Sequence, residues 1–138
     1  MIDIEHAADL FSDEMIIMVG GFATIGTSNL LVNALVQSGA KNLTIISNDA
    51  GKVTPVLEST EVIREGTANI IATKRVKKLI ASHVGRNPQV AELANAGLLE
   101  VELVPQGTLV ERIRSGGAGL GGILTPTGIG TEVELGKK

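Results

Sequence analysis

Hydrophobic positions along this chain alternate between short continuous runs and helically spaced sets. Residues 15–19 form a continuous apolar run followed by two glycines, which is typical of a strand buried on both faces, and we expect it to be the first central strand. Helical spacing follows over residues 30–35 and is closed by Gly39. A second apolar run at residues 43–47 therefore predicts a parallel β-α-β unit with a right-handed crossover.

The alternation of strand and helix continues to about residue 113, although residues 48–72 never settle into one period. The other predicted elements are a short helix capped by Asp3, a strand at residues 78–82, a helix that begins at Asn87-Pro88 and stops near Gly97, a strand at residues 101–104, and a short helix capped by Thr108. This order predicts an α/β fold with a mainly parallel sheet and helices on both faces. We expect one domain over residues 1–131 and a flexible tail over residues 132–138.

A polar or glycine turn follows each predicted parallel strand. Because the carboxyl ends of parallel strands meet at one edge of an open α/β sheet, where ligands bind, these turns are candidate site residues as a set. They are Gly20-Gly21, Asn48-Asp49, Ser82-His83 and Gln106-Gly107.

Glycine is concentrated near the end of the chain, where residues 115–122 (SGGAGLGG) and 125–131 (TPTGIGT) hold seven glycines. Such clusters are favoured where φ is positive or where the main chain approaches a ligand closely. Successive N–H groups in these loops form concave nests that bind anions. The alternative is a flexible linker, but linkers are usually polar and repetitive, whereas this segment carries Leu120, Ile123 and Pro126. We therefore interpret it as a ligand-binding segment.

Composition excludes several classes of function. Phe11 and Phe22 are the only aromatic residues and the net charge is −3, so neither a base-stacking platform nor a basic surplus for nucleic acid is present. The chain contains no cysteine, which excludes disulfides, thiolate nucleophiles and cysteine-based metal sites and fits the cytoplasm. No apolar run reaches membrane-spanning length. The basic residues of 74–78 are interpreted as a solvated surface.

Single residues give no convincing catalytic group. His83 follows a predicted strand and could act as an acid or base, but neither it nor His6 has visible triad partners. The carboxylates, including Asp49, form no recognisable pair, and no metal site is expected. The first turn lacks the G-x-G-x-x-G spacing of dinucleotide-binding proteins. The residues alone thus predict an amide-rich pocket without a nucleophile.

Three separated blocks resemble one enzyme family. The segment SDEMIIMVGGFATIG, which ends at Gly26, is similar to the amino-terminal signature of the small α-subunit of family I coenzyme A transferases. SHVGRNP at residues 82–88, VPQGTL at residues 104–109 and GGAGLGGILTPTGIGT from Gly116 follow in the family's order and at similar separations. The likeness is greatest to α-subunits of the acetate or butyrate:acetoacetate type, so the resemblance implies a CoA-transferase-like fold with Rossmann-like layering.

In that family the nucleophile is a glutamate of the companion β-subunit, so the resemblance implies no catalytic residue in this chain. It also implies a heterodimer or α2β2 heterotetramer, acyl-CoA and short-chain carboxylic acids as substrates, coenzyme A as a substrate, and no permanently bound cofactor. Gln106 would contact the substrate carbonyl or carboxylate. The other residues assigned to substrate and CoA binding are Gly20, Gly21, Phe22, Gly26, Gly107, Gly116, Gly117, Ala118 and Gly119, together with Asn48 and Ser82, which rest mainly on their strand-end positions.

The chain also departs from the family pattern. Gly26-Thr27-Ser28 stands where the signature commonly ends the first loop with Gly-x-Pro, and Thr27 or Ser28 is expected to cap the helix. Residues 51–74 are unfamiliar, and the family continues beyond the position of Lys138, so a shortened relative is expected. Two alternatives stay open: a catalytically idle CoA- or anion-binding assembly module, and a sugar-phosphate isomerase of similar topology, which would need an acid/base pair.

Overall fold

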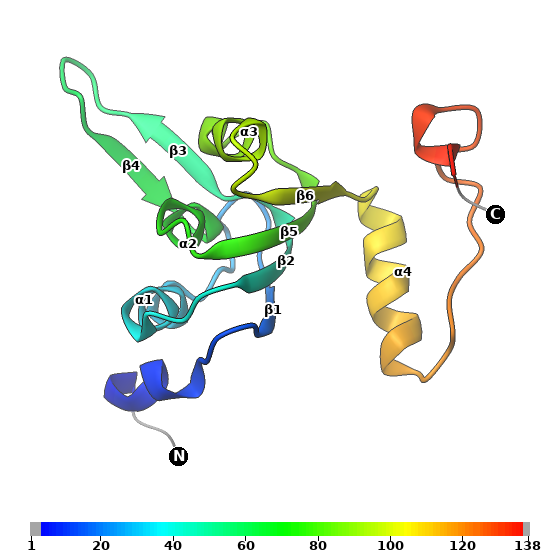
Figure 1. Ribbon diagram of the computed structural model, residues 1–138, viewed down its shortest axis with the longest axis horizontal. Coiled ribbons are helices and arrows are strands. Elements are labelled where there is room, and N and C mark those ends of the chain that lie inside the picture. The colour runs from blue at the N-terminus through cyan, green and yellow to red at the C-terminus, as the bar shows by residue number, and fades with distance from the viewer. Residues whose placement is uncertain (1–3, 137–138) are drawn as a thin grey trace. The chain divides into compact units, whose positions relative to one another are not determined.

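The computed structural model describes residues 4–136 and divides into two compact units, Met1–Leu103 and Val104–Lys138 (Figure 1). The first unit alternates strands and helices. Its elements are η1 (Ile4–Leu10), β1 (Ile16–Val19), α1 (Asn29–Ser38), β2 (Leu43–Asp49), β3 (Lys52–Pro55), β4 (Val62–Glu65), α2 (Thr67–Ala72), β5 (Val76–His83), α3 (Pro88–Asn95) and β6 (Glu100–Leu103).

The main sheet of the first unit has the strand order β1-β2-β5-β6, and every neighbouring pair is parallel. This confirms the predicted mainly parallel α/β fold. The predicted strands at residues 43–47, 78–82 and 101–104 correspond to β2, β5 and β6. The predicted start of the third helix is also confirmed, because Pro88 is its first residue and the Asn87 side chain accepts a hydrogen bond from the Gln89 amide at 3.2 Å.

The hydrophobic core lies on one face of this sheet. The parallel register aligns Ile17, Ile45, Leu79 and Val101 across the four strands, so their side chains point to the same face. These residues join the core cluster with apolar side chains of all three α-helices, which are Val32 and Leu35 of α1, Ile70 and Ile71 of α2, and Val90 and Leu93 of α3. Within the first unit the α-helices thus cover a single face (Figure 1). Helices on the second face stay a prediction.

Strand β1 is an edge strand, so the prediction that it is central and buried on both faces is wrong. Its alternate residues Ile16 and Met18 are 70% and 59% exposed, while Ile17 and Val19 pack against the core. A continuous apolar run therefore marks this strand although only one of its faces is buried in the core. Residues on the opposite face are apolar too, and that removes the alternation by which an edge strand is normally recognised.

The segment that showed no settled period contains three short elements. Strands β3 and β4 form an antiparallel hairpin, and the hairpin is followed by α2, a short helix of 6 residues. A period of two gives way to a helical period within 21 residues, so no window is long enough to reveal either. Gly51, which precedes β3, has φ +71°, and a Cβ there would overlap the Ala68 amide nitrogen and the Glu65 carbonyl oxygen. Only glycine fits this close approach.

The second unit contains α4 (Gln106–Gly117) and η2 (Glu132–Glu134). Helix α4 begins two residues before the predicted cap Thr108, because Pro105 occupies the N-cap position without a side-chain cap bond. Gly116 and Gly117 form its last turn and are not part of a loop. The single domain over residues 1–131 and the flexible tail stay predictions. Residues 137 and 138 lie outside the described residues, as does Asp3, the predicted cap of the first helix, which is a 3-10 helix.

Candidate functional site

The carboxyl edge of the main sheet brings together the last residues of β2 and β5 and the loop after β1. Val19 is paired with Ser47, and Ser47 with Ala81, so Gly20, Asn48 and Ser82 follow at one edge. The Ser82 hydroxyl donates a hydrogen bond of 2.8 Å to the Asn48 carbonyl oxygen. The predicted meeting of these positions at one edge is confirmed within the first unit. The prediction that Asn48-Asp49 and Ser82-His83 form turns is wrong, because these pairs are the last two residues of β2 and of β5.

The loop after β1 is a tight, strained turn. The amides of Phe22 and Ile25 each donate to the other residue's carbonyl oxygen, at 3.0 and 2.9 Å. Between them, Ala23 and Thr24 have φ values of 49° and 78°. Positive φ at both central residues is typical of a type I′ turn, where Asn and Gly are the usual residues. An Ala-Thr pair in this conformation costs on the order of 1 kcal/mol or more per residue, and such strain concentrates at functional sites.

A buried carboxylate holds this turn in place. Asp49, at the end of β2, is only 8% exposed. One carboxylate oxygen accepts a 2.7 Å hydrogen bond from the Ala23 amide and the other accepts a 2.7 Å bond from the Gly51 amide. The Ser47 hydroxyl donates to the Asp49 carbonyl oxygen, also at 2.7 Å. Asp49 therefore ties the loop after β1 to the end of β2 and to the start of the hairpin.

The crevice beneath the loop is tightly packed. Its walls include Gly20, Gly21, Thr27 and Asp49, and they leave essentially no space for a water molecule. A Cβ at Gly21, whose φ is +118°, would overlap the Thr27 hydroxyl. A ligand could therefore contact this loop only at its outer surface, where Phe22 is 68% exposed.

Main-chain donors are available at the same loop. Within residues 4–136 the structure gives the amides of Gly20, Gly21 and Gly26 no hydrogen-bond acceptor. Glycine leaves the main chain open to close approach. The loop after β1 therefore presents donors that can bind a carboxylate or a developing oxyanion.

The glycines of the second unit are used differently. The Ala118 amide donates to the carbonyl oxygens of Arg114 and Ser115, the Gly119 amide to that of Gly116, and the Leu120 amide to that of Ser115. These bonds close the carboxyl end of α4, so the expected anion nest of free amides is absent from residues 118–120. Gln106 and Gly107 are the exposed first residues of α4. The binding roles expected for six residues of this unit stay predictions. These residues are Gln106, Gly107, Gly116, Gly117, Ala118 and Gly119.

Titratable groups of the described residues 4–136 form no catalytic pair. The Lys78 ammonium lies 2.8 Å from a carboxylate oxygen of Glu100 and 3.1 Å from one of Glu102, and hydrogen bonds to these two carboxylates raise the pKa of Lys78 above its ordinary 10.5. Arg114 binds the Glu111 carboxylate and lowers its pKa below 4.5. Both clusters are ion pairs at exposed or half-buried positions, which is typical of surface salt bridges and not of a catalytic acid and base.

The described residues 4–136 offer neither a metal site nor a membrane-spanning helix. No group of three or more His, Asp or Glu side chains in residues 4–136 is placed to hold a metal ion. In the same residues no helix has the length and apolar character needed to span a bilayer.

Sequence reasoning placed Asp49 among the strand-end candidates and the possible acids, but it did not predict the bonds from the Ala23 and Gly51 amides. Part of its role has a local signal, because an Asp that accepts from the amide two residues later forms an Asx turn, typical of Asp-x-Gly. The bond to Ala23 spans 26 positions and leaves no such signal. The strain at Ala23 and Thr24 is likewise hidden, since neither residue type favours positive φ.

Comparisons with known proteins agree on one family. The chain is 49% identical over 138 residues to the acetate CoA-transferase subunit alpha of Escherichia coli, with 100% of this chain and 58% of that protein covered. It is also 49% identical to the acetoacetyl-CoA:acetate/butyrate CoA transferase alpha subunit of Clostridium acetobutylicum, covering 100% of this chain and 59% of that protein. The chain thus spans somewhat over half the length of these curated relatives.

A solved structure supports the same relationship. An acyl-CoA transferase of E. coli O157:H7, crystallised as a thioester complex with CoA, superposes with a TM-score of 0.74 at 25% identity, covering 96% of this chain and 27% of that one. The family model for Coenzyme A transferase matches residues 1–138. With the parallel sheet and the glycine loop at its carboxyl edge, these matches show that the chain belongs to the Coenzyme A transferase family.

Proposed function

We propose that this chain acts as the α-subunit part of a heteromeric CoA-transferase. The enzyme would move CoA between a short-chain acyl-CoA and a carboxylic acid such as acetate, butyrate or acetoacetate. The names of the two α-subunit relatives support this substrate class. The observation that carries the proposal is the loop after β1, where open glycine amides stand at the ligand-binding edge of a sheet in a member of this family.

The nucleophile in this proposal is a glutamate of a β-subunit. Its carboxylate attacks the thioester carbonyl carbon, the C–S bond breaks, and CoA leaves as a thiolate, so that a mixed acyl anhydride of the glutamate remains. The thiolate then attacks the glutamyl carbonyl and releases the first acid, and the acceptor acid completes the exchange by the reverse steps. The described residues contain ion pairs but no activated nucleophile, which fits a division of labour between the chains. The complex would be a heterodimer or an α2β2 heterotetramer, with CoA bound only as a substrate.

This chain would contribute preorganised main-chain donors. Each acyl transfer passes through a tetrahedral carbon bearing an oxyanion, and fixed N–H groups stabilise that charge without reorganising. The amides of Gly20, Gly21 and Gly26 are candidates for this role, held in place by the bond from the Ala23 amide to Asp49. The exposed ring of Phe22 beside them would form an apolar surface for the acyl chain.

The remaining candidate residues are assigned to substrate binding in the same proposal. Asn48 and Ser82 lie at the ends of β2 and β5 on the same edge, and Gln106 offers an amide side chain to a substrate carboxylate. The end of α4, from Gly116 to Gly119, would act through its small profile, since the amides of Ala118 and Gly119 are already bonded. We place the complex in the cytoplasm, a reducing compartment in which a protein without cysteine needs no disulfide.

A CoA-exchange assay tests the proposal. Labelled acetate and acetoacetyl-CoA are incubated with this chain alone, with a β-type chain alone, and with the purified complex of both. We expect labelled acetyl-CoA only from the complex. Exchange by this chain alone would contradict the proposal. An inactive complex of correct stoichiometry would also contradict it and would favour an assembly role.

A further inference from the structure

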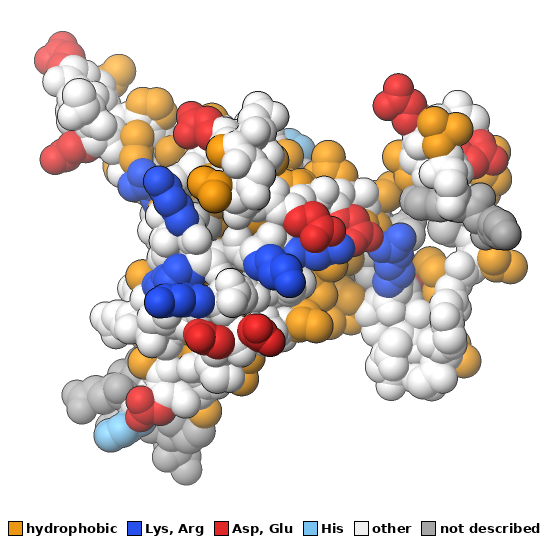
Figure 2. All heavy atoms as spheres, in the orientation of Figure 1, with side chains coloured by type: hydrophobic (Ala, Val, Ile, Leu, Met, Phe, Trp, Pro, Cys, Tyr) orange, Lys and Arg blue, Asp and Glu red, His pale blue; other side chains and the backbone are white. Residues whose placement is uncertain are grey.

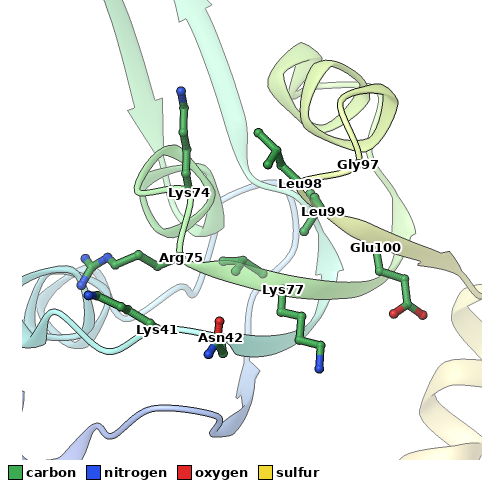
Figure 3. A pocket seen from close by; sticks show the side chains of 10 residues that line it. Lys41, Asn42, Lys74, Arg75, Lys77, Gly97, Leu98, Leu99 and Glu100 are labelled. Atoms are coloured by element: carbon green, nitrogen blue, oxygen red, sulfur yellow. The ribbon is translucent and has the colours of Figure 1, made fainter.

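A second pocket lies at the opposite, amino-terminal edge of the main sheet. It has a volume of about 480 Å³ and is lined by the residues that lead into three adjacent strands (Figure 3). Lys41 and Asn42 precede β2, Lys74 and Arg75 precede β5, and residues 97–99 precede β6. This volume is in the range of small-molecule sites, and no part of the proposed transfer reaction uses this edge.

The lining is strongly basic in a chain whose net charge is −3. It holds four cations, Lys41, Lys74, Arg75 and Lys77, and a single carboxylate, Glu100. The Glu100 carboxylate is already engaged by Lys78 at 2.8 Å, whereas within residues 4–136 none of the four cations has an ion-pair partner. Lysine and arginine side chains gather over the middle of the first unit in Figure 2. The pocket therefore carries a local excess of positive charge.

The cations border the pocket from different sides. In Figure 3 the side chains of Lys41 and Arg75 lie next to each other, Lys74 extends the opposite way from Lys77, and Leu98 adds an apolar wall. The guanidinium of Arg75 is held by a 2.6 Å hydrogen bond from Nη2 to the Val36 carbonyl oxygen. An anion with one charge would meet only part of this arrangement, whereas an extended polyanion can meet several cations at once.

Lys74 occupies a position that glycine usually fills. It follows the end of α2 with φ 58°, and Gly97 follows the end of α3 in the same way with φ 70°. A glycine is favoured after a helix because a side chain in this conformation costs on the order of 1 kcal/mol. At one of two equivalent places in the same pocket the chain thus has a lysine in a strained conformation.

A plainer explanation covers only part of the cluster. Cations are favoured at carboxyl ends of helices, and this accounts for Lys74 after α2 and for Arg75, which binds a carbonyl of the last turns of α1. It does not account for Lys77, which lies inside β5 and is exposed. The Asp13 carboxylate accepts a hydrogen bond from the Lys41 amide and reduces the positive charge on that side, which leaves Lys74, Arg75 and Lys77 as the main anion-binding groups.

We propose that this pocket binds a small polyanion that carries at least two phosphate-type groups. Lysine ammonium and arginine guanidinium are the side chains that bind phosphate most strongly. The volume of about 480 Å³ has room for a small molecule, and the exposed Leu98 would tolerate an organic substituent on the ligand. This binding site would lie at the amino-terminal edge of the main sheet, opposite the edge that carries the loop after β1.

The test is an NMR titration of the 15N-labelled chain with inorganic tripolyphosphate at low salt and at 150 mM salt. We expect saturable shifts at the amides of residues 41–42, 74–77 and 97–100, unchanged positions at residues 20–26, and weaker binding at the higher salt because the charges are screened. Lys74→Gly removes the charge and suits the local φ, and Lys77→Gln changes an exposed strand residue. The double variant should bind about tenfold more weakly, as the loss of two exposed cation contacts implies.

Lys52→Gln is the matched control. Lys52 is a half-exposed lysine of β3 that lies 4.0 Å from Glu65 and outside the pocket, so its loss should leave the affinity unchanged. An equal loss of affinity in the control would overturn the proposal, because binding would then follow overall charge. Absence of saturable shifts up to millimolar tripolyphosphate would overturn it as well. Binding of a Glu-rich peptide but not of tripolyphosphate would assign the surface to a protein partner instead and would also refute the proposal.

Discussion

The carboxylate of Asp49 accepts a 2.7 Å hydrogen bond from the amide of Ala23, a residue held at φ 49°. The bond joins the end of β2 to the turn after β1, whose glycine amides are the proposed donors to substrate. A conformation that Ala rarely adopts is thus fixed by a buried anion from the neighbouring strand. The position of the proposed donors therefore depends on Asp49, which need not contact the substrate itself.

Removal of Asp49 should destabilise the fold. Asp49→Ala deletes two charge-assisted bonds to the Ala23 and Gly51 amides and should lower the free energy of unfolding by about 3 kcal/mol. Asp13→Ala is the matched control, because Asp13 accepts one 2.7 Å bond from the Lys41 amide at an exposed site and should cost about 1 kcal/mol or less. Urea unfolding of both variants measures the difference. Equal losses would refute the structural role of Asp49.

Asp49 should also affect catalysis in the assembled complex. Asp49→Asn keeps a carboxamide oxygen for one of the two amides but loses the charge, so the loop should be less well ordered. We expect kcat to fall by about tenfold to a hundredfold with a smaller change in KM, since misplaced donors act mainly on the transition state. The Asp13→Asn complex should keep its kcat. A rise in KM alone would argue against a positioning role.

Two glycines with the same φ separate conformational strain from steric overlap. Gly51 and Gly97 have φ of 71° and 70°, but a Cβ would overlap the Ala68 and Glu65 backbones only at Gly51. Gly97→Ala should cost about 1 kcal/mol through φ alone, and Gly51→Ala about 3 kcal/mol or more. Thermal or urea unfolding checks both values. Similar costs would mean that the hairpin moves to admit the methyl group.

The ion cluster of Lys78, Glu100 and Glu102 predicts a pH dependence of stability. Hydrogen bonds to Glu100 and then Glu102 raise the pKa of Lys78 above 10.5. A raised lysine pKa contributes stability that is fully present below the unfolded-state pKa and is lost as the pH rises through the folded-state value. We therefore expect Glu100→Gln to lower the Lys78 pKa, measured by NMR titration of its Nζ group. An unchanged titration curve would contradict the contribution of Glu100.

Gly117 distinguishes a structural from a ligand-binding role for the end of α4. It is helical, and a Cβ there would meet no atom of the chain within 4 Å. Gly117→Ala should therefore stabilise the chain by up to about 1 kcal/mol. If ligand or partner backbone approaches this position, the same variant should lower transfer in the complex despite its greater stability. Full activity in a stabilised complex would remove Gly117 from the site.

Much of the fold could be predicted because burial against a sheet leaves a local pattern. The apolar runs at residues 43–47 and 78–82 lie inside β2 and β5, the central strands. The pattern wrongly predicted a strand buried on both faces at β1, because the exposed side chains of Ile16 and Met18 are apolar as well. It also failed in the hairpin of β3 and β4, whose stability depends on packing rather than on a long periodic segment.

The site was predicted less completely. Position at the carboxyl edge follows from topology, so the meeting of Gly20, Asn48 and Ser82 at that edge was predicted from the sequence, while their binding roles stay predictions. Glycine content alone does not distinguish a loop from a helix end, and Gly116 and Gly117 proved to be helical. A loop whose conformation depends on a bond 26 positions away cannot be read from neighbouring residues.

The central claim is that this chain supplies main-chain donors while the reactive carboxylate belongs to a partner. The most direct measurement is mass spectrometry of the purified complex after incubation with acetoacetyl-CoA and reduction of the enzyme–CoA thioester with borohydride. The account predicts a modified glutamate in a peptide of the β-type chain and no modified residue in this one. A modified glutamate within residues 1–138 of this chain would contradict it.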